Sequence, residues 1–238
     1  MLSTDAYLDT LRRDATAFAD LLRDVDLEAP VPDCPGWNVA DLASHLGGVH
    51  RWAHGVVTTG APGAEPVGPS ERVELLDWFD EGAAQLIHAL RTTDPDSATW
   101  TFGPPPRQVS FWVRRQPHET SMHLHDLRCA AGRPAPADVE LAVDGIDEVV
   151  SMMFPRQVRL ARIPALPYGI RLDPSDSPAV AYSLAGDGSD PTATTVATVT
   201  GTSQELLLAL WRRIPIDALT IDGDIAAARA VFTLALTP

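Results

Sequence analysis

The stretch from Pro117 to Asp126 carries the residue types and spacing best suited to binding a metal ion. Glu119 and His123 are four residues apart, so a helix places both side chains on one face. A carboxylate and an imidazole on one face can fill two coordination positions of a zinc-like ion. Asp126 follows three residues after His123, close enough to orient one of its ring nitrogens. The stretch therefore predicts part of a metal site, and a third ligand must come from elsewhere.

The third ligand is expected on a second helix, which begins at Asn38. His45 borders the apolar stripe that includes Leu46, so it faces partly inward, where an imidazole needs a polar partner. Helices of a bundle can face each other across the core, where metal sites are built. His45, Glu119 and His123 would form a two-histidine, one-carboxylate set, as in several catalytic zinc enzymes. Such a set leaves a coordination position open, which indicates chemistry rather than a structural role.

Other histidines and the two cysteines are weaker candidates. His50 and His54 form another pair with helical spacing, but His50 lies about 140° around the helix from His45. We expect this pair at a pocket rim or on the surface. Cys34, just before the helix, is expected to be a packed, inert thiol. Cys34 and Cys129 form no CxxC pair and are too few for a disulfide scaffold, so reduced thiols in a cytosol are expected.

Four amphipathic helices are predicted in the first half of the chain, over residues 4–25, from Asn38, from a Ser70 cap, and over 109–131. Asn38 suits the N-cap of the second helix, with Asp41 at its third position. Pro117 lies inside the fourth helix and is expected to kink it or to restart it. Gly132 is expected to end that helix. Four helices with long connections indicate a bundle.

The second half of the chain changes character after one further helix, predicted over 138–154 with Asp138 as its N-cap. Short runs rich in β-branched residues predict strands at 168–172, 179–184, 194–201 and 219–224. Helices are expected over 204–211, capped by Thr202 or Ser203, and over 225–236. Strands framed by helices indicate a small α+β domain.

Composition limits the classes of function. The 238 residues suit one large domain or two small ones, and an apolar fraction of 45% is ordinary for a chain that buries a core. The net charge of −14 argues against binding nucleic acid or an anionic membrane. The first five residues show no secretory signal, and no apolar run approaches the ~20 residues of a membrane span. We therefore expect a cytoplasmic protein.

Several blocks of sequence resemble the mycothiol-dependent maleylpyruvate isomerase family. Cys34-Pro35-Gly36-Trp37 with Asp41-Leu42-Ala43-Ser44-His45-Leu46 is similar to the start of its second helix. The run from His118 to His123 with Asp126 is similar to its second ligand motif, and blocks at 144–148 and 200–224 are similar to its linker helix and C-terminal domain. The resemblance covers nearly the whole chain. It implies an α+β protein, with a DinB-like four-helix metal-binding bundle plus linker helix at 1–154 and a small α+β domain at 155–238.

The resemblance also implies roles for particular residues. His45, Glu119 and His123 would hold a divalent metal, with zinc the leading choice. Arg213 matches an arginine that the family places near its active-site cleft, so we expect it, together with Asp126, to serve catalysis. Adjacent Arg212 is expected to bind the cofactor or to replace Arg213 in that role. The implied co-substrate is mycothiol, an actinobacterial thiol.

Three hypotheses for function follow. In the first, the metal favours the thiolate form of mycothiol, and the thiolate sulfur adds to an electron-poor alkene. Rotation about the resulting single bond and loss of the thiolate isomerise a maleylpyruvate-like cis-alkene diacid. If the adduct is not released, the same site performs S-transfer. The second is a hydrolase that activates water on the metal. The third is a non-catalytic metal-binding or sensing protein, closed by His118 or Cys129 as fourth ligand. The expected partners are a small thiol and an electrophilic or dicarboxylate substrate, with no nucleic acid or membrane, in a monomer or weak homodimer.

Overall fold

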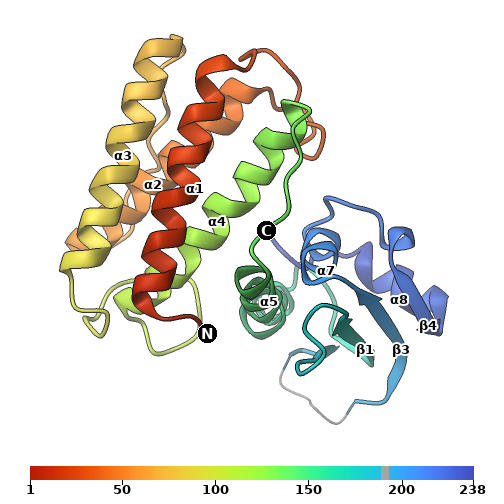
Figure 1. Ribbon diagram of the computed structural model, residues 1–238. Helices are drawn as coiled ribbons and strands as arrows, with labels where there is room; N and C mark the ends of the chain where they lie inside the picture. The colour runs from red at the N-terminus through yellow and green to blue at the C-terminus, as the bar shows by residue number, and fades with distance from the viewer. Residues whose placement is uncertain (189–192) are drawn as a thin grey trace. The chain divides into compact units, whose positions relative to one another are not determined.

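The computed structural model describes residues 1–188 and 193–238, and these form two compact units. The first unit spans Leu2–Ala135, and the second spans Pro136–Pro238 together with Met1. The first is helical, whereas the second combines helices with a four-stranded sheet (Figure 1). The predicted α+β class is therefore confirmed. Within the described residues, no helix has the length and apolar character needed to cross a membrane.

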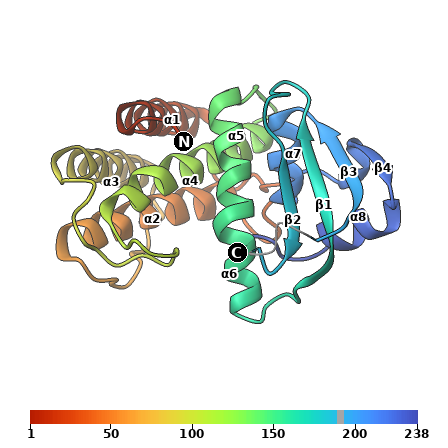
Figure 2. The ribbon, with the colours of Figure 1, turned by 90° about the horizontal axis from the view of Figure 1, so that it is seen from below.

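The first unit is a bundle of four long helices. They are α1 (Thr4–Asp24), α2 (Val39–Thr59), α3 (Arg72–Thr92) and α4 (Val109–Ala130). Helix α1 packs against α3 and α4, and α2 packs against the same two helices, as the views in Figures 1 and 2 also show. The apolar stripes meet in a core that includes the fully buried side chains of Phe18, Leu46, Phe79 and Trp112. The predicted bundle is thus present, with α2 and α4 in contact.

Helix α2 begins as its sequence predicts, whereas α3 does not. Asn38 and Asp41 form a reciprocal capping box at the start of α2, which satisfies two of its free backbone N–H groups. The expected Ser70 cap is wrong, because the N-cap of α3 is Glu71, whose side chain makes no capping hydrogen bond. Arg72 instead donates to the carbonyls of Leu22 and two neighbours at the end of α1. A long-range contact therefore sets where α3 starts.

Helix α4 runs without a break through Pro117, so the predicted restart at this proline is wrong. Pro117 is buried and lacks only the one backbone N–H that would have bonded one turn earlier. Gly132 has a left-handed φ of 64°, and its N–H donates to the carbonyl of Cys129, so the predicted glycine end is confirmed. One unbroken helix keeps Glu119 and His123 on a common face.

The helix predicted over 138–154 is longer and contains an irregular segment. Helix α5 (Val139–Glu148) continues through a π-helical segment (Val149–Met153) into α6 (Phe154–Arg159). Pro155 cannot donate a backbone hydrogen bond, and the N–H of Phe154 reaches five residues back to Val149. Helix α5 packs against α7 of the second unit, so the expected linker helix groups with this unit, which begins at Pro136.

The second unit is built on a mixed sheet with the strand order β2-β1-β3-β4 (Figure 2). Its strands are β1 (Leu166–Pro174), β2 (Tyr182–Gly186), β3 (Thr195–Gly201) and β4 (Thr220–Gly223). Strand β1 pairs antiparallel with β2 and parallel with β3, and β3 pairs antiparallel with β4. Helix α7 (Ser203–Leu210) is capped by Thr202, which shares a capping box with Glu205. After a 3-10 turn (Ile216–Ala218), the last helix, α8 (Ile225–Phe232), ends earlier than predicted.

Candidate metal centre

Helices α2 and α4 bring the three predicted ligands together. One ligand atom from each of His45, Glu119 and His123 lies within 4.8 Å of the others. Glu119 Oε1 is 3.5 Å from His45 Nε2 and 3.3 Å from His123 Nε2. The imidazole rings meet edge to face at a centroid distance of 5.1 Å. Two imidazole nitrogens and one carboxylate oxygen therefore converge on one small volume.

The spacing of these atoms fits a divalent ion. A metal about 2.1 Å from two ligands at a tetrahedral angle separates the ligand atoms by about 3.4 Å. The two distances from Glu119 Oε1, 3.5 and 3.3 Å, are close to that value. Nitrogen and carboxylate donors in this ratio suit zinc and related ions. The residues present thus fit the group that the sequence implied, although their role as ligands stays a prediction.

Asp126 makes the contact expected of it. Its Oδ2 lies 2.9 Å from His123 Nδ1, and the carboxylate is fully buried. In the neutral ring, Nδ1–H donates to this oxygen and the lone pair of Nε2 faces Glu119. Burial alone would lower the pKa of His123, but its hydrogen bonds to Asp126 and Glu119 raise the pKa to about 9. Metal binding at neutral pH must therefore displace a proton from His123.

Sequence reasoning missed Arg115, which is buried and forms an ion pair with the half-buried Glu119 one helical turn later. Burial alone would raise the pKa of Glu119, but Arg115, followed by His123 and His45, holds it well below its usual value. Glu119 is therefore an ionised carboxylate, as a metal ligand must be. The spacing of four residues between Arg115 and Glu119 was the signal that could have revealed this pair.

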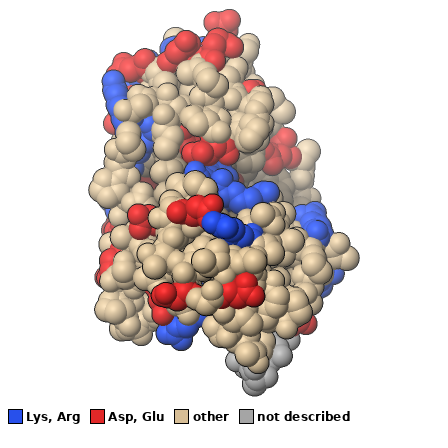
Figure 3. All heavy atoms as spheres, turned by 90° about the vertical axis from the view of Figure 1, so that its right-hand side faces the viewer, with Lys and Arg blue, Asp and Glu red and all other residues tan. Residues whose placement is uncertain are grey.

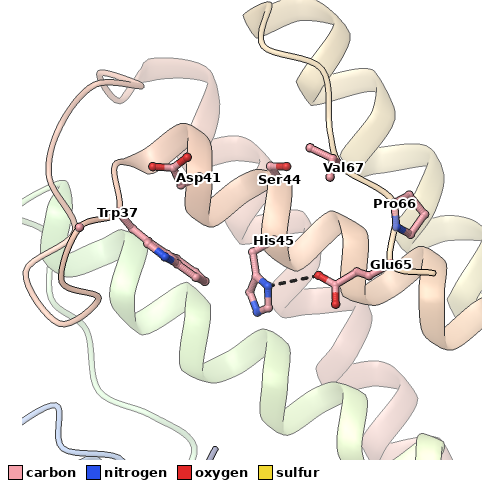
Figure 4. Close-up of a pocket in the computed structure, with 8 residues that line it drawn as sticks. Trp37, Asp41, Ser44, His45, Glu65, Pro66 and Val67 are labelled. Atoms are coloured by element: carbon pink, nitrogen blue, oxygen red, sulfur yellow. Dashed lines mark ion pairs between the residues drawn. The ribbon is translucent and has the colours of Figure 1, made fainter. Parts of the chain in front are cut away.

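Sequence reasoning also missed Glu65, which comes from the loop after α2. Its Oε1 lies 3.3 Å from His45 Nδ1, so it occupies for His45 the place that Asp126 occupies for His123 (Figure 4). Glu65 is exposed, and no helical or strand periodicity relates it to His45. Only the path of the Pro/Gly-rich loop places it there.

A pocket of about 360 Å³ opens beside His45 within the first unit. It is lined by Gly36, Trp37, Asp41, Ser44, His45, Glu65, Pro66 and Val67. Figure 4 shows the His45 ring between Trp37 and Glu65. The Trp37 ring lies 4.9 Å from the ring of His45 and 6.3 Å from that of His123. One imidazole of the candidate site is therefore reachable from a pocket with an aromatic wall.

The structure corrects the expectation for His50. This residue is fully buried rather than at a rim, and its Nε2 lies 2.9 Å from Thr120 Oγ1. Burial lowers the pKa of His50 to about 3, so the ring is neutral at physiological pH. Its helix face turns toward α4 and toward Phe79 of α3, which sequence spacing could not reveal. His54 is half-buried.

The cysteines have polar partners that the sequence did not indicate. Cys34 is half-buried, and its Sγ lies 3.4 Å from Asp126 Oδ2. Cys129 Sγ lies 3.4 Å from His125 Nε2. Burial, followed by the charges of Asp33 and Asp126, raises the pKa of Cys129. Among the residues that the structure describes, neither Cys129 nor His118 is grouped with the candidate ligand atoms of His45, Glu119 and His123.

Arg212 and Arg213 belong to the second unit, directly after α7. They line a pocket of about 500 Å³ together with Ala209, Ile214, Pro215, Ile216, Asp217, Arg229, Phe232 and Thr233. Arg212 is exposed and has a left-handed φ of 59°, whereas Arg213 is half-buried and donates to the carbonyl of Trp211 at 3.1 Å. On the face drawn in Figure 3, basic side chains lie among acidic ones. The catalytic and cofactor roles of these arginines stay predictions.

Comparisons with known proteins agree across both units. The model of the mycothiol maleylpyruvate isomerase N-terminal domain matches residues 8–128, and that of the MDMPI C-terminal domain matches residues 140–230. The crystal structure of the mycothiol-dependent maleylpyruvate isomerase is similar at 16% identity with a TM-score of 0.64. The crystal structure of the same isomerase with one histidine mutated to alanine is similar at 16% identity with a TM-score of 0.66. Each comparison covers 94% of this chain and 95% of the other, and at this identity it shows a common fold. No curated protein matches.

Proposed function

This chain belongs to the mycothiol-dependent maleylpyruvate isomerase family, and we propose that it is a metal-dependent enzyme that applies a small thiol to an electrophilic substrate. The proposed thiol is mycothiol, as in the isomerases of known structure. The proposed reaction is isomerisation of a maleylpyruvate-like cis-alkene diacid or S-transfer to an electrophile. The observation that carries the proposal is the convergence of His45, Glu119 and His123 beside an open pocket.

We propose zinc as the metal, because its preferred ligand types and distances match these three side chains. Bound there, zinc would supply the positive charge that favours the thiolate form of a thiol. The chain's own residues prepare this site. Asp126 holds the Nδ1–H of His123, and Arg115 keeps Glu119 ionised inside the bundle. Trp37 lines the pocket beside both imidazoles.

Binding of a dicarboxylate needs a cation, and the pocket beside His45 carries the acidic side chains of Asp41 and Glu65. We propose that Arg213 pairs with a substrate carboxylate and that Arg212 contacts the thiol. A guanidinium can bind a carboxylate through two parallel hydrogen bonds, which orients the substrate as well as attracting it. The third arginine of their pocket, Arg229, forms an ion pair with Asp217.

Metal analysis combined with thiol binding tests the proposal. We expect His45→Ala and His123→Ala each to lose one equivalent of zinc relative to wild type, whereas His88→Ala, on α3, should lose none. Calorimetry should show mycothiol binding to the zinc-loaded wild type and none to the metal-depleted protein. Full zinc content in His123→Ala would refute the ligand assignment. Turnover of maleylpyruvate or of an electrophilic probe without any thiol would instead favour the metal-dependent hydrolase.

A further inference from the structure

A second group of side chains of the types that bind metal ions lies in the first unit and shares no residue with the group of His45, Glu119 and His123. It consists of Asp33, His125 and Cys129, all half-buried, whose candidate ligand atoms lie within 4.8 Å of one another. His125 and Cys129 are four residues apart on α4, so they project from one face. Asp33 comes from the connector between α1 and α2. One loop and one helix therefore contribute carboxylate, imidazole and thiol to one place.

The observed geometry suits a borderline-soft cation. Zinc bonds to sulfur at about 2.3 Å and to nitrogen at about 2.05 Å, which at a tetrahedral angle separates the two ligand atoms by about 3.6 Å. The distance from Cys129 Sγ to His125 Nε2 is 3.4 Å. Thiolate and imidazole ligands select zinc-like ions over magnesium or calcium, which prefer oxygen.

We propose that Asp33, His125 and Cys129 form an accessory site for a zinc-like divalent cation, separate from the site of His45, Glu119 and His123. Three half-buried protein ligands leave room for solvent to complete the coordination shell. This proposal does not depend on the proposed function, because the two groups share no ligand. It would hold even for a protein without catalytic activity.

A cation at this site would tie the connector to the end of α4. The connector already folds back on itself, because the N–H of Val31 donates to Trp37 and the N–H of Val39 to Ala29. It also carries Trp37, whose ring lines the pocket beside His45. Holding Asp33 against α4 therefore stabilises one wall of that pocket. The role that follows is structural support of the substrate pocket rather than chemistry.

Cobalt titration of the full-length, metal-free protein under reducing conditions tests the accessory site. A thiolate ligand gives bound Co²⁺ an intense near-ultraviolet charge-transfer absorption, which imidazole and carboxylate ligands do not give. Wild type should bind two equivalents and develop this absorption. Cys129→Ser should lose the absorption and one equivalent, and His125→Ala should weaken binding of the same equivalent at least tenfold. His45→Ala should lose the other equivalent and keep the absorption.

Cys34→Ser is the control for the other thiol, because Cys34 lies in a third candidate group with Asp126 and His123, and that group contains neither His125 nor Cys129. It should retain both equivalents and the absorption. Loss of the absorption in Cys34→Ser, its persistence in Cys129→Ser, or its absence from wild type would overturn the proposal. Circular dichroism of each variant shows whether it folds, and His125→Ala keeps the test decisive if Cys129→Ser does not.

Discussion

His50 should make the helical bundle sensitive to mild acid. Its pKa is lowered to about 3 by burial, against about 6.5 in an unfolded chain. Between pH 6.5 and pH 3 the unfolded state binds a proton at His50 that the folded state does not bind. The contribution of the neutral His50 to the free energy of unfolding is therefore fully present above pH 6.5 and is lost as the pH falls toward 3. Linkage gives a loss of about 2 kcal/mol between pH 7 and pH 5 and about 3 kcal/mol by pH 4. The loss between pH 7 and pH 5 hardly depends on the pKa of His50 in the folded state, because that pKa lies well below 5.

The matched variant is His50→Gln, whose amide can replace the bond from His50 Nε2 to Thr120 without titrating. Other groups contribute in both proteins and cancel in the difference. Asp14, for example, has a pKa raised by burial and acts in the opposite direction, because its folded form binds a proton more readily.

Denaturant unfolding with a metal chelator measures this difference at pH 7 and pH 5. Tryptophan fluorescence reports on the bundle once Trp211, the single tryptophan of the second unit, is replaced by Phe in both proteins. The parent should lose about 2 kcal/mol more between the two pH values than His50→Gln. Equal losses would show that His50 accepts a proton inside the folded bundle and would refute the reasoning.

Three further changes probe the supports of the two units. Asp126→Asn should weaken zinc binding about 10- to 100-fold in a chelator competition, because an outer partner of a ligating histidine is altered; unchanged affinity would show that Asp126 does not support the site. Arg115→Met removes the largest of the charges that keep Glu119 ionised but leaves the protonated His123 beside it, so the metal-free bundle should lose about 1–3 kcal/mol in denaturant unfolding, and no loss would contradict this. Thr202→Ala removes the cap shared with Glu205 and should cost the second unit about 1 kcal/mol, read from amide hydrogen exchange of α7; Thr202→Ser should restore it.

The parts of the candidate site that sequence could reveal are those set within one helix. Glu119 and His123 share a face because of helical repeat alone, and Asp126 reaches His123 for the same reason. His45 was predictable from its place beside an apolar stripe, which must face the core. Placing it opposite Glu119 required only that α2 and α4 pack together, which the bundle confirms.

The parts that sequence did not reveal depend on contacts between distant segments. Glu65 reaches His45 from a loop with no periodicity, and Cys34 reaches Asp126 across 92 positions of chain. The start of α3 is likewise set by Arg72 on the end of α1 rather than by the best local cap, Ser70. Such contacts follow the path of loops, about which composition says little.

Asp126 makes one contact within its own helix, to His123, and one contact with a distant segment, to Cys34. The same Oδ2 that lies 2.9 Å from His123 lies 3.4 Å from the thiol of Cys34, so one buried carboxylate joins a ligand helix to the connector. That connector carries Trp37 into the pocket wall beside His45. The orientation of the His123 ring and the shape of the neighbouring pocket are therefore mechanically linked. The proposed ligands lie on helices, whereas Trp37 and Glu65 of the pocket wall lie on loops, so loop changes can alter the molecule that the pocket accepts without moving the proposed ligands.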